Sequence, residues 1–140
     1  AAVGGDHAAE TRPVIVGTAA AGQREIHAIV AEAQEAGRDA ARAGAGLLDV
    51  DRAARSVVTE AGYGDYFDHG LGHGVGLQIH EAPFFSPRST GKLPAGSPVT
   101  IEPGIYLPGR GGVRIEDTIL VGEGPSRSLT ESPRGLVALG

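Results

Sequence analysis

The segment from His69 to Pro83 reads HGLGHGVGLQIHEAP and holds three of the five histidines of the chain. Glycines stand between them at positions 70, 72, 74 and 76. Inside a helix each glycine costs about 1 kcal/mol relative to alanine, so this segment cannot form a stable helix. We therefore expect an extended backbone, in which the missing side chains leave room for a ligand or for a second strand.

Two carboxylates follow in strand-like surroundings, Glu102 in TIEPGIYL and Glu116 in GGVRIEDT. The PGRGG stretch at 108–112 predicts a hairpin turn, which would bring these two segments side by side and let both glutamates converge. Two carboxylates that close repel each other unless a cation or a shared proton lies between them. Histidine with two glutamates on strands is a ligand set for a hard or borderline divalent metal. The pattern therefore predicts a metal site.

The first half of the chain predicts two helices. Apolar residues recur at helical spacing from Gln23 to Ala43, and again after Asp49. We expect Asp49 to cap the second helix, Gly62 to end it, and its apolar residues to face inward; these are Val50, Ala54, Val57, Val58 and Ala61. A short apolar run from Pro13 to Gly17 precedes both helices and predicts a strand.

After Gly64 the apolar residues alternate, which predicts strands at 75–79, 99–101 and 113–115. The stretch from His80 to Pro98 is rich in Pro, Ser and Gly and predicts a surface loop. Two helices followed by a β-meander define an α+β fold. The sequence contains no internal repeat or domain boundary, so we expect one domain.

Composition excludes several classes of protein. A net charge of −5 argues against nucleic acid and against an anionic membrane as partners. The chain has no cysteine, which excludes disulfides and thiolate metal sites and fits a cytoplasmic location. No apolar run approaches the roughly 20 residues of a membrane span, and no signal-peptide pattern opens the sequence.

Taken together, the ordered motifs resemble the pita-bread metallopeptidase superfamily, which includes prolidase, aminopeptidase P, creatinase and methionine aminopeptidase. The resemblance is closest to the proline-directed peptidases and covers nearly the whole chain. It implies the C-terminal half of the catalytic domain, in which two helices pack on a curved antiparallel sheet. Residues 1–140 would then be a single truncated pita-bread domain.

The resemblance also implies a ligand set. His73, Glu102 and Glu116 would bind a divalent metal such as Mn, Co or Zn, with Glu116 bridging two ions in the complete enzyme. Glu102 would in addition act as general base toward the nucleophilic water.

Three further residues match family positions near the substrate. His69 and His80 match histidines that contact substrate and stabilise the tetrahedral intermediate. Arg114 matches an arginine that orients the acidic ligands. The substrate implied is a small peptide with proline, hydrolysed by a metal-activated water.

Two of the five ligands of the family are missing. They are aspartates in a segment of the form DxGAxxxGYxSDxTR, whose final TR matches residues 11–12. This alignment places the second aspartate at Ala9 and the first ahead of Ala1. Asp6 and Glu10 are nearby carboxylates, but a one-residue offset on a strand points a side chain to the opposite face. We therefore expect at most one metal ion per chain.

Three interpretations stay open at this stage. The chain is a proline-directed metallopeptidase of doubtful activity, a non-catalytic metal-binding or interaction domain derived from that family, or one piece of a longer or split enzyme. The missing half predicts either a homodimer or a separate N-terminal half as partner. Creatinase hydrolyses a non-peptide C–N bond on the same scaffold, so the scaffold alone does not fix the substrate.

Overall fold

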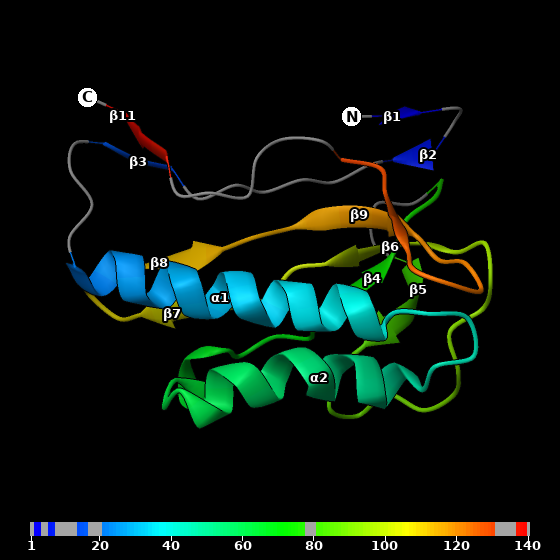
Figure 1. The fold of residues 1–140 in the computed structure, drawn as a ribbon, viewed down its shortest axis with the longest axis horizontal. Coiled ribbons are helices and arrows are strands. Elements are labelled where there is room, and N and C mark those ends of the chain that lie inside the picture. The colour runs from blue at the N-terminus through cyan, green and yellow to red at the C-terminus, as the bar shows by residue number, and fades with distance from the viewer. Residues whose placement is uncertain are drawn as a thin grey trace.

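Two helices lie side by side against one face of an antiparallel sheet (Figure 1). The computed structural model describes residues 2–3, 6–7, 14–16, 21–77, 81–130 and 137–139. The helices are α1, Ala21–Ala40, and α2, Leu47–Glu60, followed by a short 3-10 helix, η1, at Gly64–Tyr66. Neither helix within these residues has the length and apolarity that a membrane span requires.

The sheet on which the helices pack has five strands in the order β10-β9-β6-β4-β5, with every neighbouring pair antiparallel. Two smaller pairs, β1-β2 and β7-β8, are also antiparallel, whereas β3 and β11 pair in parallel. The strands are β1 Ala2–Val3, β2 Asp6–His7, β3 Val14–Val16, β4 Gly72–Gly74, β5 Glu81–Phe85, β6 Pro98–Ile101, β7 Gly104–Leu107, β8 Gly111–Arg114, β9 Asp117–Leu120, β10 Arg127–Ser128 and β11 Val137–Leu139.

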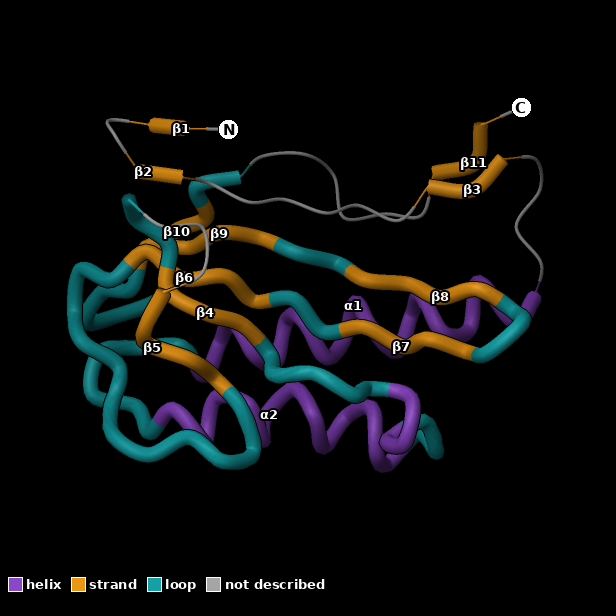
Figure 2. The backbone as a smooth tube through the Cα atoms, turned by 180° about the vertical axis from the view of Figure 1, so that it is seen from behind, coloured by secondary structure: helices purple, strands orange, loops and turns teal. Residues whose placement is uncertain are grey.

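One long hairpin runs through the sheet, because β6 continues into β7 and β8 continues into β9 (Figure 2). Its turn lies at 108–110, as the PGRGG motif predicts. The pairing register is the same on both sides of the short break in the ladder, with Ile101 opposite Asp117 and Gly104 opposite Arg114. Glu102 therefore stands directly opposite Glu116.

The core lies between the helices and the sheet and confirms most of the predicted inward positions. Both helices and the sheet contribute residues that are at most 5% exposed; these include Ile26, Val30, Ala33, Val50, Ala54, Val58, Val99, Ile101, Val113 and Ile115. Val57 is only half-buried, and Ala61 is exposed because it lies beyond the last helical residue, Glu60.

The start of α2 corrects one expectation. Gly46, not Asp49, occupies the N-cap position, and it makes no side-chain cap hydrogen bond. The backbone N–H of Leu47 instead donates to the Gly91 carbonyl at 3.0 Å, so a distant loop supplies the acceptor that a side-chain cap would provide. Asp49 lies in the first turn and pairs with Arg52 at 3.8 Å.

The strand expected at 75–79 lies three residues earlier, in the glycine-rich motif itself. Val75 is buried just after β4, but Leu77 is 83% exposed and Ile79 falls outside the described residues. The stretch from His80 to Pro98 is not only loop, because it includes β5, which pairs with β4 at the edge of the sheet. An edge strand tolerates Pro83, since its outer side needs no N–H donor.

Close approach of neighbouring backbone explains the glycine at position 72. A Cβ there would collide with the backbone carbonyl oxygen of Thr100, which cannot rotate aside. We expect Gly72→Ala to lower the free energy of unfolding by about 1–3 kcal/mol, the usual cost of overpacking. Gly122→Ala is the matched control, because nothing lies within 4 Å of its added Cβ. Urea unfolding of both variants measures the difference, and equal stabilities would contradict this account of β4.

Candidate metal site

Three neighbouring strands bring His73, Glu102 and Glu116 to one point on the sheet. His73 lies in β4, and its backbone N–H donates to Thr100 Oγ1 at 3.1 Å. Thr100 lies in β6, two residues before Glu102, so their side chains share a face of the sheet. Glu116 is the cross-strand neighbour of Glu102 in the hairpin register. Like charges directly opposite destabilise a sheet, and a cation between them removes that cost.

The distances are those of a small cation site. One ligand atom from each of His73, Glu102 and Glu116 lies within 4.8 Å of the others, and this is the group that offers three such ligands in the described part of the chain. His73 Nε2 lies 3.4 Å from Glu102 Oε2. A divalent ion with nitrogen and oxygen ligands at about 2.0–2.2 Å fits between atoms at such separations.

Hydrogen bonds around the cluster also fit a cation. His73 Nδ1 lies 2.9 Å from the Gly74 carbonyl oxygen, which only accepts, so Nδ1 carries the proton. The lone pair of neutral His73 is then on Nε2, toward the carboxylates, in the arrangement that metal-binding histidines show. Glu102 Oε2 is buried and accepts no aligned hydrogen bond. The described residues therefore fit one divalent ion.

Without a metal ion, the contacts within the cluster shift the pKa values of His73 and Glu102. Burial alone would lower the pKa of His73, but contact with Glu102, the Gly74 carbonyl and the charges of both glutamates outweigh it, and the pKa is raised. Burial likewise favours a higher pKa for Glu102, yet His73, Glu116 and Thr100 together bring that pKa below its usual value. Both shifts favour the charged forms of the two side chains, imidazolium and carboxylate.

The signs of these shifts predict how the stability of the metal-free chain depends on pH. The contribution of His73 is complete below its unfolded-state pKa, near 6.5, and is lost as pH rises through the raised folded-state pKa. The contribution of Glu102 is complete above its unfolded-state pKa, near 4.5, and is lost as pH falls through the lowered folded-state pKa. We expect this pair to stabilise the metal-free chain most between these two values. Chemical unfolding in a chelator, with and without His73→Gln, measures it; an identical pH profile for the variant would contradict the assignment.

A second hydrogen-bonded group lies beside the cluster. His69 Nδ1 lies 2.7 Å from the Gly70 carbonyl oxygen, and His69 Nε2 lies 2.8 Å from the Tyr106 hydroxyl. The Gly70 carbonyl only accepts, so Nδ1 donates to it; when Nε2 carries no proton, it accepts from the Tyr106 hydroxyl. Burial raises the pKa of Tyr106, although nearby Arg114 acts in the opposite direction, and the hydroxyl stays protonated at neutral pH. Arg114 Nη2 also lies 4.0 Å from Glu116 Oε2.

Several of the side chains described above line one pocket of about 340 Å³. Its polar side consists of His69, His73, Glu102 and Arg114, and its apolar side includes Phe84 and Phe85. Phe84 is 52% exposed, so the pocket has an apolar rim as well as an apolar wall.

The structure thus brings five of the six predicted residues together: His69, His73, Glu102, Arg114 and Glu116. The sixth, His80, lies outside the described residues, as do Ala9 and Glu10, and the side chain of Asp6 is likewise not described.

The sequence patterns did not single out Tyr106, whose hydroxyl is hydrogen-bonded to His69. Tyr106 lies four residues after Glu102, and alternate residues of a strand share a face. This spacing could have predicted that Tyr106 lies on the same face as Glu102. Asp117 was also overlooked. This buried carboxylate accepts from Gln34 Nε2 at 2.8 Å and from Thr130 Oγ1 at 2.6 Å, which fixes the strand immediately after Glu116.

Similarity to known proteins agrees with this geometry. The chain is 50% identical over 127 residues to an Xaa-Pro dipeptidase of Pyrococcus furiosus, covering 91% of this chain and 36% of that protein. Its structure matches that of a dipeptidase from Pyrococcus horikoshii OT3 with a TM-score of 0.92 and 46% identity, covering 96% of this chain and 38% of that one. An Xaa-Pro dipeptidase from Bacillus anthracis matches with a TM-score of 0.90 and 47% identity, over 93% and 37% of the two chains.

The fold and the three-ligand cluster together define a metallopeptidase-type domain, with part of the pita-bread fold. The sequence profile of metallopeptidase family M24 matches residues 1–123, and the chain belongs to that family. It spans a little over a third of the length of the relatives that it matches.

Proposed function

We propose that this chain carries part of the active site of a proline-directed metallopeptidase. This part comprises the residues that bind one metal ion and the general base that transfers protons. The observation that supports this most strongly is the cluster of His73, Glu102 and Glu116, of which His73 and Glu102 line a pocket together with His69 and Arg114. The names of relatives at up to 50% identity, which include Xaa-Pro dipeptidase, favour peptides of the Xaa-Pro type.

In this proposal His73, Glu102 and Glu116 hold a divalent ion, with Mn, Co and Zn as candidates. Such an ion lowers the pKa of a bound water and polarises the scissile carbonyl. Glu102 accepts the proton of the attacking water and passes it to the proline nitrogen as the C–N bond breaks. Arg114 holds Glu116 in place by charge.

The oxygen that becomes negative in the tetrahedral intermediate needs donors close by. His69 lies in the pocket, but both its ring nitrogens have partners in this structure, so it would act as such a donor only after Nε2 gains a proton and releases Tyr106. His80 keeps its proposed role at the substrate from the sequence pattern alone. The exposed ring of Phe84 at the rim of the pocket suits the proline ring.

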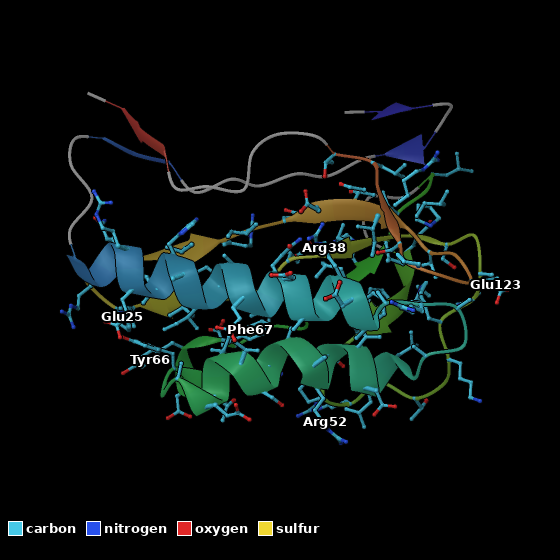
Figure 3. All side chains as sticks on the ribbon, viewed as in Figure 1. Glu25, Arg38, Arg52, Tyr66, Phe67 and Glu123 are labelled. Carbon is cyan, nitrogen blue, oxygen red and sulfur yellow. The ribbon has the colours of Figure 1, made fainter. Side chains whose placement is uncertain are left out.

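A complementation experiment tests this function. In a chimera, residues 1–11 are replaced by the corresponding N-terminal part of the Pyrococcus furiosus Xaa-Pro dipeptidase, which adds the part of that protein that this chain does not span. We expect metal-dependent hydrolysis of Xaa-Pro dipeptides, and a loss of at least about 100-fold in kcat in Glu102→Gln, on the scale of losing one transition-state group. Glu123→Gln is the control, because Glu123 is exposed and lies at an outer loop (Figure 3).

A folded chimera that binds metal and hydrolyses none of these dipeptides would contradict the enzymatic proposal. That outcome would favour the second candidate, a non-catalytic metal-binding or interaction domain. The three-ligand cluster is compatible with it, since one ion with three protein ligands is a sufficient binding site.

We also propose a partner for the 140-residue chain, either a second copy or a separate N-terminal half. The edge strand β5 carries exposed Phe84, and Leu77 close to it in sequence is 83% exposed. An edge strand with exposed apolar side chains favours association. The strand predicted at Pro13–Gly17 is present as β3, and one of its two edges is occupied because β3 pairs with β11.

We expect light scattering at micromolar concentration to give the mass of a homodimer, and Leu77→Lys to shift the chain toward monomer. Leu129→Lys is the control, because Leu129 is apolar but only 38% exposed and lies directly after β10, at the other edge of the sheet from β5. A monomer whose melting transition does not depend on concentration would contradict the dimer.

A further inference from the structure

We propose that Asp51 and Arg55 are positioning residues, which hold the backbone of Phe67–Leu71 and thereby direct His69 into the pocket. Both lie on α2, outside the metal cluster. The catalytic importance of this inference rests on the proposed function of the pocket. The structural part of the inference rests on contacts among the described residues.

Asp51 and Arg55 form a tight pair one helical turn apart. Arg55 Nε lies 2.8 Å from Asp51 Oδ2, and Arg55 Nη2 lies 3.0 Å from Asp51 Oδ1. Two parallel N–H···O bonds of this kind fix the guanidinium plane as well as its distance. The Asp51 carboxylate is 1% exposed, so the pair is shielded from water on that side.

The remaining donors and acceptors of the pair all bind one segment. Arg55 Nη1 donates to the Phe67 carbonyl at 2.8 Å, and Arg55 Nη2 donates to the His69 carbonyl at 2.7 Å. The backbone N–H of Leu71 lies 3.1 Å from Asp51 Oδ1 and also donates to the Phe85 carbonyl at 2.9 Å.

The spacing of these three partners is informative. All three contacts fall on alternate residues, 67, 69 and 71. The Asp51–Arg55 pair therefore binds this segment at three points, although the segment is not a strand and bends at His69 and Leu71. This segment leads directly into β4, which carries His73.

Ring contacts connect the pair to His69 a second time. The Arg55 guanidinium lies over the Phe67 ring at 4.0 Å, and the Phe67 ring meets the His69 ring edge-on at 5.1 Å. Phe67 is 2% exposed and belongs to the apolar core. Arg55 thus determines both the main chain of His69 and the surface on which its imidazole rests.

Lysine at position 55 would keep the charge but lose the fork that reaches Asp51 and two carbonyls at once. In Arg55→Lys we expect the His69 ring to leave its single tautomer, so that its two ring ¹⁵N signals in a long-range ¹H–¹⁵N spectrum move toward their average. In the active chimera we expect kcat to fall by about 100-fold with little change in KM, as for small misplacements of catalytic groups.

The matched control lies on the same helix. Arg52 pairs with Asp49 at 3.8 Å, but both side chains are mostly exposed, at 65% and 73%, and Arg52 projects away from the sheet (Figure 3). Arg52→Lys should leave the His69 signals and kcat unchanged. Asp51→Asn is a second test variant, and circular dichroism checks that each variant is folded.

Identical His69 spectra in Arg55→Lys and Arg52→Lys would overturn the proposal. Global unfolding of both Arg55→Lys and Asp51→Asn would also overturn it, because the pair would then be an anchor of the whole fold. The spectra are recorded on the metal-free 140-residue chain, so an inactive chimera would contradict the proposed function without affecting this result.

Discussion

The 140-residue chain is expected to bind one divalent ion, and Glu116→Ala is expected to remove that binding. Glu116 is 7% exposed and stands directly opposite Glu102, so it supplies a buried negative charge that no neighbouring group replaces in the ligand set. Losing even an outer partner of a ligand costs about 10–100-fold in metal affinity. Loss of a ligand itself should exceed that range.

Calorimetric titration with Mn, Co and Zn measures both the stoichiometry and the affinity. Glu123→Ala, at an exposed glutamate away from the cluster, should bind as the unaltered chain does. Two tightly bound ions per chain would contradict the prediction, and so would unchanged affinity in Glu116→Ala.

The second large effect concerns turnover by the chain alone. Ala9 stands where the sequence pattern of the family has a ligand aspartate, and alanine supplies no oxygen. Removing one group that stabilises transition-state charge costs about 100- to 1000-fold in rate, and loss of a metal ligand should cost at least as much. We expect Xaa-Pro dipeptides with Mn to be hydrolysed at least 1000-fold more slowly than the roughly 10 per second of a median enzyme.

A continuous assay with dipeptides and tripeptides, at metal concentrations that saturate the calorimetric site, measures this rate. A rate near that of a median enzyme would show that Asp6, Glu10 or a second chain supplies the missing oxygens. Substituting each carboxylate in turn by its amide would then identify the donor.

Much of the site was predictable because two simple periodicities determine it. Alternation along strands put Glu102 on the face opposite Val99 and Ile101, and the turn motif at 108–112 brought Glu116 next to it. The structure has the expected turn, with Val99 and Ile101 fully buried. Local pattern was sufficient wherever a residue's position depended on its own strand.

Where the prediction was wrong, a distant partner decided the outcome. Asp49 has the chemistry of a cap, but the Gly91 carbonyl already binds the first N–H of α2. The strand at β4 runs through glycines of low strand propensity, because Thr100 and neighbouring carbonyls come so close that no side chain fits. The partners of Arg55 lie 12 and 14 residues further along the chain, and no spacing rule connects them.

The common register of β6–β7 and β8–β9 has a consequence for how this hairpin tolerates change over evolution. Substitutions in the exposed turn at 108–110 leave Glu102 and Glu116 opposite each other. An insertion or deletion that slips the register by one residue would carry one glutamate to the helix-covered face, since side chains alternate. Homologous chains that keep the chemistry should therefore conserve the length of this turn, and should conserve its residues less strictly except at Gly109, whose φ is +73°.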